Sequence, residues 1–87
     1  MINYDPQKLY QEYKGRFKSM TDEQLIAAFN NEVRNSGWTS ARASYLATLH
    51  EEFENRSYDY SDIGDKKQLS FAKKIKLLGK KIMIDEI

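Results

Sequence analysis

The spacing of apolar residues changes along this chain, and that change constrains the fold more than any other feature. Up to about residue 55, apolar side chains recur every three to four positions, which is the spacing of one face of a helix. Residues 75–84 also fit an alternation of apolar and polar positions, the pattern of a strand with one covered face. The sequence therefore predicts a mainly α fold, a small three-helix domain with a C-terminal β-hairpin.

The first helix is predicted to begin beside Asp5. Asp5 is a good N-cap, and Pro6 suits the first helical position because the N–H that proline lacks would have no partner there. The aromatic residues that follow recur at helical spacing. We expect this helix to run from about Pro6 to Lys18, with its aromatic stripe in the core.

The second helix has the clearest start signal. Thr21 and Gln24 have the spacing of a capping box, in which each side chain accepts a hydrogen bond from the backbone N–H of the other residue. The helix is expected to stop at the stretch NSGW. There Gly37 can take the left-handed conformation that ends many helices, and Trp38 can fold back onto Val33.

A third helix is predicted from a cap at Thr39 or Ser40 to about Asn55. The connection before it is short, so the second and third helices are expected to pack as neighbours. Acidic residues crowd its last turns, which the helix dipole disfavours, and Arg56 partly offsets them.

The predicted core joins the apolar faces of the three helices. Residues 56–67 are rich in turn formers, so we expect a loop there that is held to the core by Tyr58, Tyr60 and Ile63. The helices are expected to contribute Tyr13, Phe17, Leu25, Phe29, Val33, Leu46, Leu49 and Phe53.

The stretch KKIKLLGKKIMI, residues 73–84, fits two structures. With Gly79 and Lys80 at the centre of a type II′ turn, it forms a hairpin that places apolar residues on one face and lysines on the other. As a helix, it aligns Phe71, Ile75, Leu78 and Ile82, with Gly79 as a penalty in its middle. The hairpin is favoured, and an all-α four-helix domain is the alternative.

Size and composition predict one small domain over residues 1–87. The chain has no cysteine, which fits a reducing compartment, and the expected location is the cytoplasm. It begins without the apolar core of a secretion signal, and no apolar run approaches the roughly 20 residues that span a bilayer. No membrane partner is expected.

Charge is distributed unevenly behind a net charge of +1. Residues 1–65 hold seven Lys/Arg and eleven Asp/Glu, whereas residues 66–84 hold seven lysines and no acid. Residues 66–87 are therefore expected to form a basic ribbon or helix packed on the helical domain. Such a segment either offers a surface to an anionic partner or lies against the protein's own acidic helices.

Catalytic chemistry has little support in the sequence. His50 is the only histidine, and the scattered glycines form no phosphate-binding loop. Asp59, Asp62 and Asp65 lack the twelve-residue loop and closing Glu of a calcium site. We predict no catalytic residue, no metal site and no cofactor, and we expect a protein that is not an enzyme.

Two binding functions remain. The first is a protein-interaction or regulatory module that contacts another protein, or a second copy of itself, through Trp38, Tyr58 and Tyr60 or through an open hairpin edge. The alternative is nucleic-acid binding, which requires lysines together on an exposed face with no acidic partner. The lysines predicted to contact phosphates are Lys73, Lys74, Lys76, Lys80 and Lys81.

Overall fold

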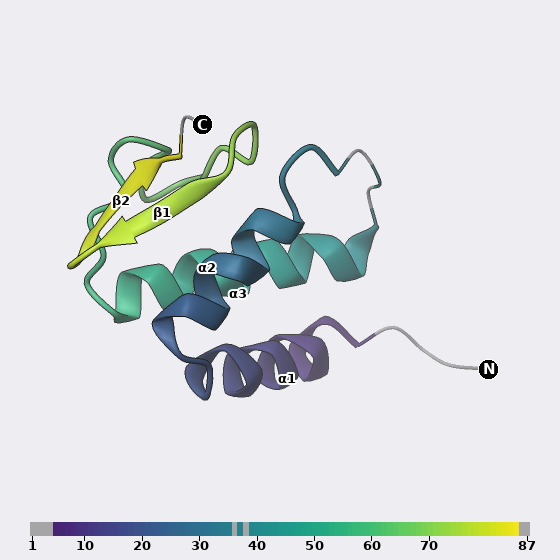
Figure 1. Ribbon diagram of the computed structural model, residues 1–87. Helices are drawn as coiled ribbons and strands as arrows, with labels where there is room; N and C mark the ends of the chain where they lie inside the picture. The colour runs from purple at the N-terminus through teal and green to yellow at the C-terminus, as the bar shows by residue number, and fades with distance from the viewer. Residues whose placement is uncertain (1–4, 36, 38, 86–87) are drawn as a thin grey trace.

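The structure is a computed structural model that describes residues 5–35, 37 and 39–85. Three helices come first in the chain and a two-stranded antiparallel sheet follows them (Figure 1). This arrangement confirms the predicted mainly α fold with a C-terminal hairpin, and the all-α alternative is wrong. The elements are α1 (Pro6–Lys18), α2 (Asp22–Asn31), α3 (Ser40–Asn55), β1 (Ile75–Leu78) and β2 (Lys81–Ile84).

The predicted helix starts are confirmed by their caps. The Asp5 carboxylate accepts the backbone N–H groups of Gln7 and Lys8 at 3.1 and 3.2 Å. Thr21 and Gln24 form both hydrogen bonds of the capping box. Thr39 caps α3 by accepting the backbone N–H of Arg42 at 3.0 Å. These local signals are readable from sequence because each involves residues no more than three positions apart.

The predicted end of α2 is wrong. The helix stops at Asn31, and the residue with left-handed backbone is Arg34, with φ of 62°, rather than Gly37. The Arg34 N–H donates to the carbonyl of Phe71 at 3.1 Å. The chain turns at Arg34, earlier than predicted, where it forms this bond to a distant segment. A bond between distant segments leaves no pattern in the local sequence. The expected contact of Trp38 with Val33 lies outside the described residues.

The end of α3 is a Schellman motif. Ser57 takes the left-handed position with φ of 58°, its N–H donates to the Glu54 carbonyl, and the Tyr58 N–H donates to the Phe53 carbonyl. The Phe53 and Tyr58 rings pack with centroids 5.5 Å apart, which is the apolar contact typical of this motif. The turn therefore directs the chain, and Tyr58 with it, back onto the core.

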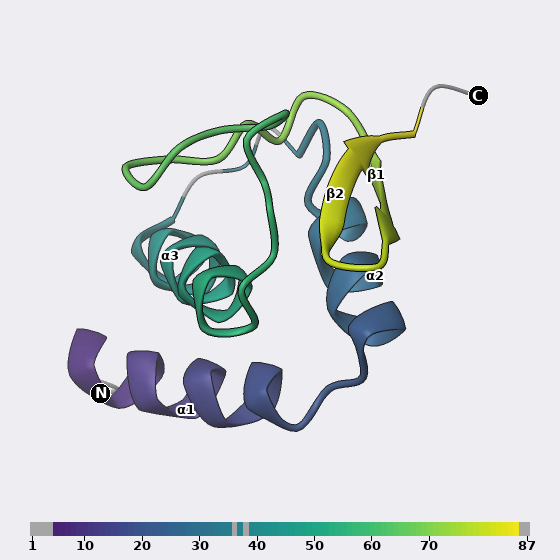
Figure 2. The same ribbon diagram turned by 90° about the vertical axis from the view of Figure 1, so that its left-hand side faces the viewer.

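The core lies between the helices and the inner face of the ribbon. Figure 2 shows α1 crossing below α3, while α2 lies beside the hairpin. Most of the predicted core is confirmed, but Tyr13 and Val33 are only partly buried against it, and Leu46 is half-buried. The fully buried side chains are Phe17, Leu25, Phe29, Thr48, Leu49, Phe53, Ile75 and Ile82.

The hairpin has the predicted register. Ile75 pairs with Ile84, and Leu77 pairs with Ile82. Gly79 has φ of 62°, which is the positive value that the first central residue of a type II′ turn requires. Because residues directly opposite each other share a face, the four apolar residues turn toward the helices and Lys76, the lysine of β1, turns away.

Both outer edges of the ribbon are partly closed by the rest of the chain. Beside β1, the Asn30 side chain accepts the Ile75 N–H at 2.8 Å and donates to the Ile75 carbonyl at 3.0 Å. Beside β2, Asp59 exchanges backbone hydrogen bonds with Lys80 and Ile82. The open edge expected from sequence is therefore short, which leaves little room for strand addition by a partner.

Replacing Asn30 with alanine is expected to lower the free energy of unfolding by about 2 kcal/mol, because the N–H and carbonyl of Ile75 lose their partners. Asn31→Ala is the matched control, since Asn31 is exposed one position later on the same helix. Its effect should stay within about 0.5 kcal/mol. Urea unfolding of both variants measures the difference, and equal losses would show that Asn30 does not anchor the ribbon.

Candidate functional site

The five lysines predicted to contact phosphates fall into two groups. Lys73, Lys74 and Lys76 are exposed, and within the described part of the chain none of them forms an ion pair. Lys74 and Lys76 project from the outer face of the ribbon because the pleat turns Ile75 inward. Exposure and the lack of an ion pair are two features that a phosphate-binding surface requires.

Lys80 and Lys81 are engaged by the protein itself. The Lys80 ammonium donates to the Arg56 carbonyl at 3.1 Å and lies 5.7 Å from the centre of the Tyr58 ring. The Lys81 ammonium lies 3.5 Å from Asp59 and 3.6 Å from Asp62. Hydrogen bonds from Ser61, together with the Lys81 charge, lower the pKa of the Asp59 carboxyl. The acidic part of the chain therefore neutralises Lys81, the lysine of β2.

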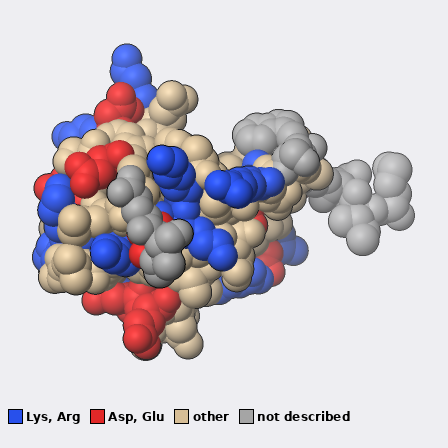
Figure 3. All heavy atoms as spheres, turned by 45° about the horizontal axis from the view of Figure 1, so that its top comes forward, with Lys and Arg blue, Asp and Glu red and all other residues tan. Residues whose placement is uncertain are grey.

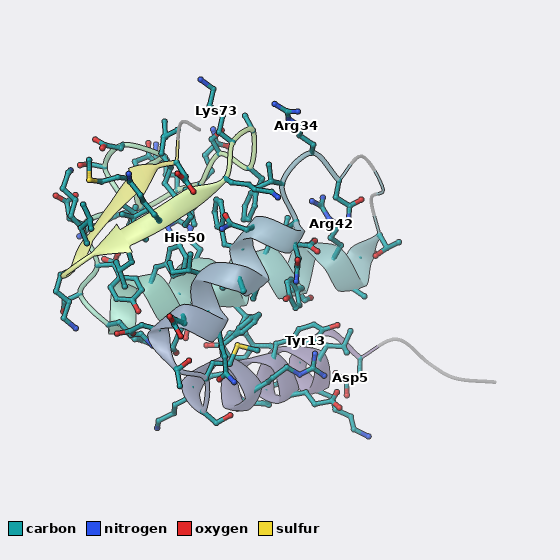
Figure 4. All side chains as sticks on the ribbon, viewed as in Figure 1. Asp5, Tyr13, Arg34, Arg42, His50 and Lys73 are labelled. Carbon is teal, nitrogen blue, oxygen red and sulfur yellow. The ribbon has the colours of Figure 1, made fainter. Side chains whose placement is uncertain are left out.

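Arg34 joins the three unpaired lysines, although the sequence analysis did not select it. It lies about 40 positions before them in the sequence, and the backbone bond between Arg34 and Phe71 brings it to their end of the ribbon. Figure 4 shows Arg34 and Lys73 projecting from the same side of the molecule. No sequence signal links these residues, because their proximity depends on where α2 ends.

We define the basic face as Arg34, Lys73, Lys74 and Lys76. Figure 3 looks at the molecule from the side on which Arg34 and Lys73 project, and blue side chains spread across its middle. The larger red patches lie nearer the edges of this view. Lys66 and Lys67, in the loop before the ribbon, are exposed as well and form no ion pair with a described residue.

The predicted partner-binding tyrosines contribute to the core. Tyr58 and Tyr60 are 5% and 8% exposed. The Tyr58 hydroxyl donates to Asp22, and the Tyr60 hydroxyl donates to Glu54. Their expected role as anchors of the loop is thus confirmed, whereas a role in binding a partner stays a prediction. Trp38, the third predicted contact, lies outside the described residues.

An apolar feature lies at the tip of the ribbon. Leu78 is 57% exposed and is the one large hydrophobic side chain so exposed among residues 5–35, 37 and 39–85. Beside β1 runs a groove of about 410 Å³, which we name the β1 groove. Its apolar lining is Ile26, Ile75 and Leu77, and its charged residues are Asp22, Glu23 and Lys76, although Lys76 forms no ion pair with either acid.

His50 has a structural neighbour. Its ring meets the Tyr60 ring edge-on, with centroids 5.2 Å apart. In the part of the chain that the structure describes, no group of His, Asp and Glu side chains is arranged to hold a metal ion. Asp59 and Asp62 face Lys81, and the Asp65 carboxylate accepts the backbone N–H groups of Lys67 and Gln68.

The described helices include none that is long and apolar enough to cross a membrane. Searches of family models, curated proteins and solved structures each found no match to this chain.

The pKa of Tyr60 is raised to about 12, mainly because its hydroxyl donates to the Glu54 carboxylate. A raised pKa means that this bond contributes fully to stability below the ordinary tyrosine value of about 10 and is lost as the pH rises toward 12. Titration of tyrosine absorbance should show a late-ionising group that disappears in Tyr60→Phe. In Glu54→Gln the late step should instead move toward the ordinary tyrosine value while the total absorbance change stays the same. An unchanged late step in Tyr60→Phe would contradict the assignment to Tyr60.

Proposed function

We propose that this chain is a non-enzymatic binding module that contacts the phosphate backbone of nucleic acid through its basic face. One observation carries the proposal: Lys73, Lys74 and Lys76 are exposed and form no ion pair with a described residue, and the exposed Arg34 projects from the same side as Lys73 (Figure 4). When exposed cations of a protein neutralise phosphates, the counterions condensed on the nucleic acid are released, and this release drives binding.

The side chains of the basic face suit the backbone better than the bases. Lysine is a flexible point charge, and contacts from lysine to phosphate position a protein without reading sequence. Only Arg34 could make the bidentate bonds by which guanidinium groups recognise guanine. We therefore expect affinity that depends on salt and little on nucleotide sequence.

A protein partner is the second candidate, and the exposed Leu78 beside the β1 groove favours it. The sequence alone favoured this function. The burial of Tyr58 and Tyr60 reduces its support, because two of its three aromatic contacts are occupied inside the protein. The closed edges of the ribbon reduce the support for strand addition in the same way.

The main test is binding of short single-stranded and duplex DNA and RNA across a salt series. In Lys74→Glu/Lys76→Glu, affinity should fall at least about tenfold, and the slope of log affinity against log salt should decrease by about 2 for duplex DNA. Both side chains are exposed, so circular dichroism should show an intact fold.

Lys8→Glu/Lys18→Glu is the matched control for this experiment. It makes the same change in net charge on the exposed surface of α1, away from the ribbon (Figure 1). Its affinity should change by less than about threefold, because charges beyond a Debye length of about 10 Å are screened. Equal losses in the two variants, or no binding at low salt, would overturn the proposal.

Self-association through Leu78 tests the simplest form of the second candidate. If a second copy covers this residue, sedimentation should show a dimer at high protein concentration, and Leu78→Lys should abolish it. The Lys8→Glu/Lys18→Glu protein should still dimerise. A wild-type protein that remains monomeric at every concentration would exclude this version of a protein partner.

A further inference from the structure

A second concave feature lies between α3 and the loop that precedes the ribbon. This α3 hollow has a volume of about 420 Å³, within the range of roughly 300–1,000 Å³ typical of small-molecule sites. The residues that decide its chemistry are Arg42, Leu46, His50, Lys67, Gln68 and Phe71. None of the side chains that line it is a carboxylate.

Local structure fixes the loop that forms one wall of the hollow. The Asp65 carboxylate accepts the N–H groups of Lys67 and Gln68 at 2.8 and 3.1 Å, and the Asp65 N–H donates to the Gln68 carbonyl at 3.0 Å. Gly64 permits this tight loop, because a Cβ there would lie 2.3 Å from the Gln68 carbonyl oxygen. The backbone of Lys67 and Gln68 is therefore fixed beside the hollow.

The rest of the lining combines charge with an apolar surface. The Arg42 guanidinium is oriented by Glu32, with 3.0 Å between Nε and the carboxylate. The Phe71 ring is held in place by stacking on Phe29, with centroids 4.3 Å apart. Because Glu32 offsets much of the Arg42 charge, Lys67 is the main cation available to a ligand.

We propose that the α3 hollow binds a single nucleotide unit. A phosphate would lie at Lys67 and His50, and the planar base would lie against Leu46 and Phe71, with Gln68 able to hydrogen-bond the edge of the base. A nucleotide uses all three kinds of lining, namely cationic, apolar and amide. Inorganic phosphate or an apolar molecule alone would use only part of them.

The hollow adjoins the basic face. Phe71 lines the hollow, and its carbonyl accepts the N–H of Arg34, which belongs to the basic face. A strand on the basic face could therefore place one unstacked nucleotide in the hollow, which a paired duplex could not do. This inference rests on the proposed function for the source of the nucleotide, and it predicts a preference for single strands.

The first experiment follows backbone amide NMR signals of the full chain during titration with AMP, adenosine or inorganic phosphate. AMP should shift the signals of Ala47, His50 and the loop around Lys67, and it should bind at least about tenfold more tightly than either fragment. Shifts scattered over the surface, or equal binding of all three molecules, would overturn the site.

Variants separate the hollow from general charge. Lys67→Glu and Ala47→Trp should each weaken AMP binding at least about tenfold, the first by removing the cation and the second by filling the space. Lys66→Glu is the matched control, since Lys66 precedes Lys67 but does not line the α3 hollow. A loss in Lys66→Glu as large as that in Lys67→Glu would contradict the proposed geometry.

The titration is then repeated with a short single strand and the corresponding duplex. Preference for the single strand, with shifts at both the hollow and the basic face, supports a strand as the source of the nucleotide. If AMP binds the hollow but neither nucleic acid binds, the site takes a free nucleotide and the proposed function fails. If nucleic acid binds only the basic face and AMP does not bind, the proposed function stands and this inference is overturned.

Discussion

The rest of the structure depends on the hydrogen bonds that the Arg56 guanidinium makes. Its guanidinium donates to the carbonyls of Phe17 and Met20 where α1 ends, to Asp22 where α2 begins, and to Glu52 in α3, at 2.7 to 2.9 Å. Burial opposes the charge, but the bonds to Glu52, Tyr58 and Asp22 raise its pKa above the ordinary value. Its carbonyl also accepts the Lys80 ammonium at the hairpin turn. One residue thus joins the ends of all three helices to the ribbon.

This arrangement explains why the ribbon can exist in so small a protein. An isolated two-stranded hairpin is marginal in water, so its stability must come from the helices. Ile75 and Ile82 are fully buried against the helical core, and Asn30 supplies β1 with hydrogen bonds that a third strand would otherwise provide. The same packing that buries these isoleucines directs Lys74 and Lys76 outward. The exposed charge is therefore a consequence of the way the fold is completed.

Much of the fold was predictable because its signals are local. The cap residues act over three positions, and the alternation around Gly79 specifies both the turn and the register. The candidate site was less predictable, because it depends on contacts between distant segments. Lysine spacing in the sequence could not show that Lys81 faces Asp59 and Asp62, or that Arg34 would reach Phe71. The α3 hollow likewise depends on a loop that no helical or strand pattern describes.

The remaining question is why the lysines before and within β1 are left without acidic partners. Lysines often guard exposed strand edges, but Asn30 already occupies the edge at Ile75 and Asp59 occupies part of the edge of β2. Lys73 and Arg34 lie outside the strands, where there is no edge to guard. The chain also contains acidic residues that pair with a ribbon lysine, since Asp59 and Asp62 both lie close to the Lys81 ammonium. Edge protection can explain Lys76 in β1, but only the proposed phosphate-bearing partner would account for all four cations of the basic face together.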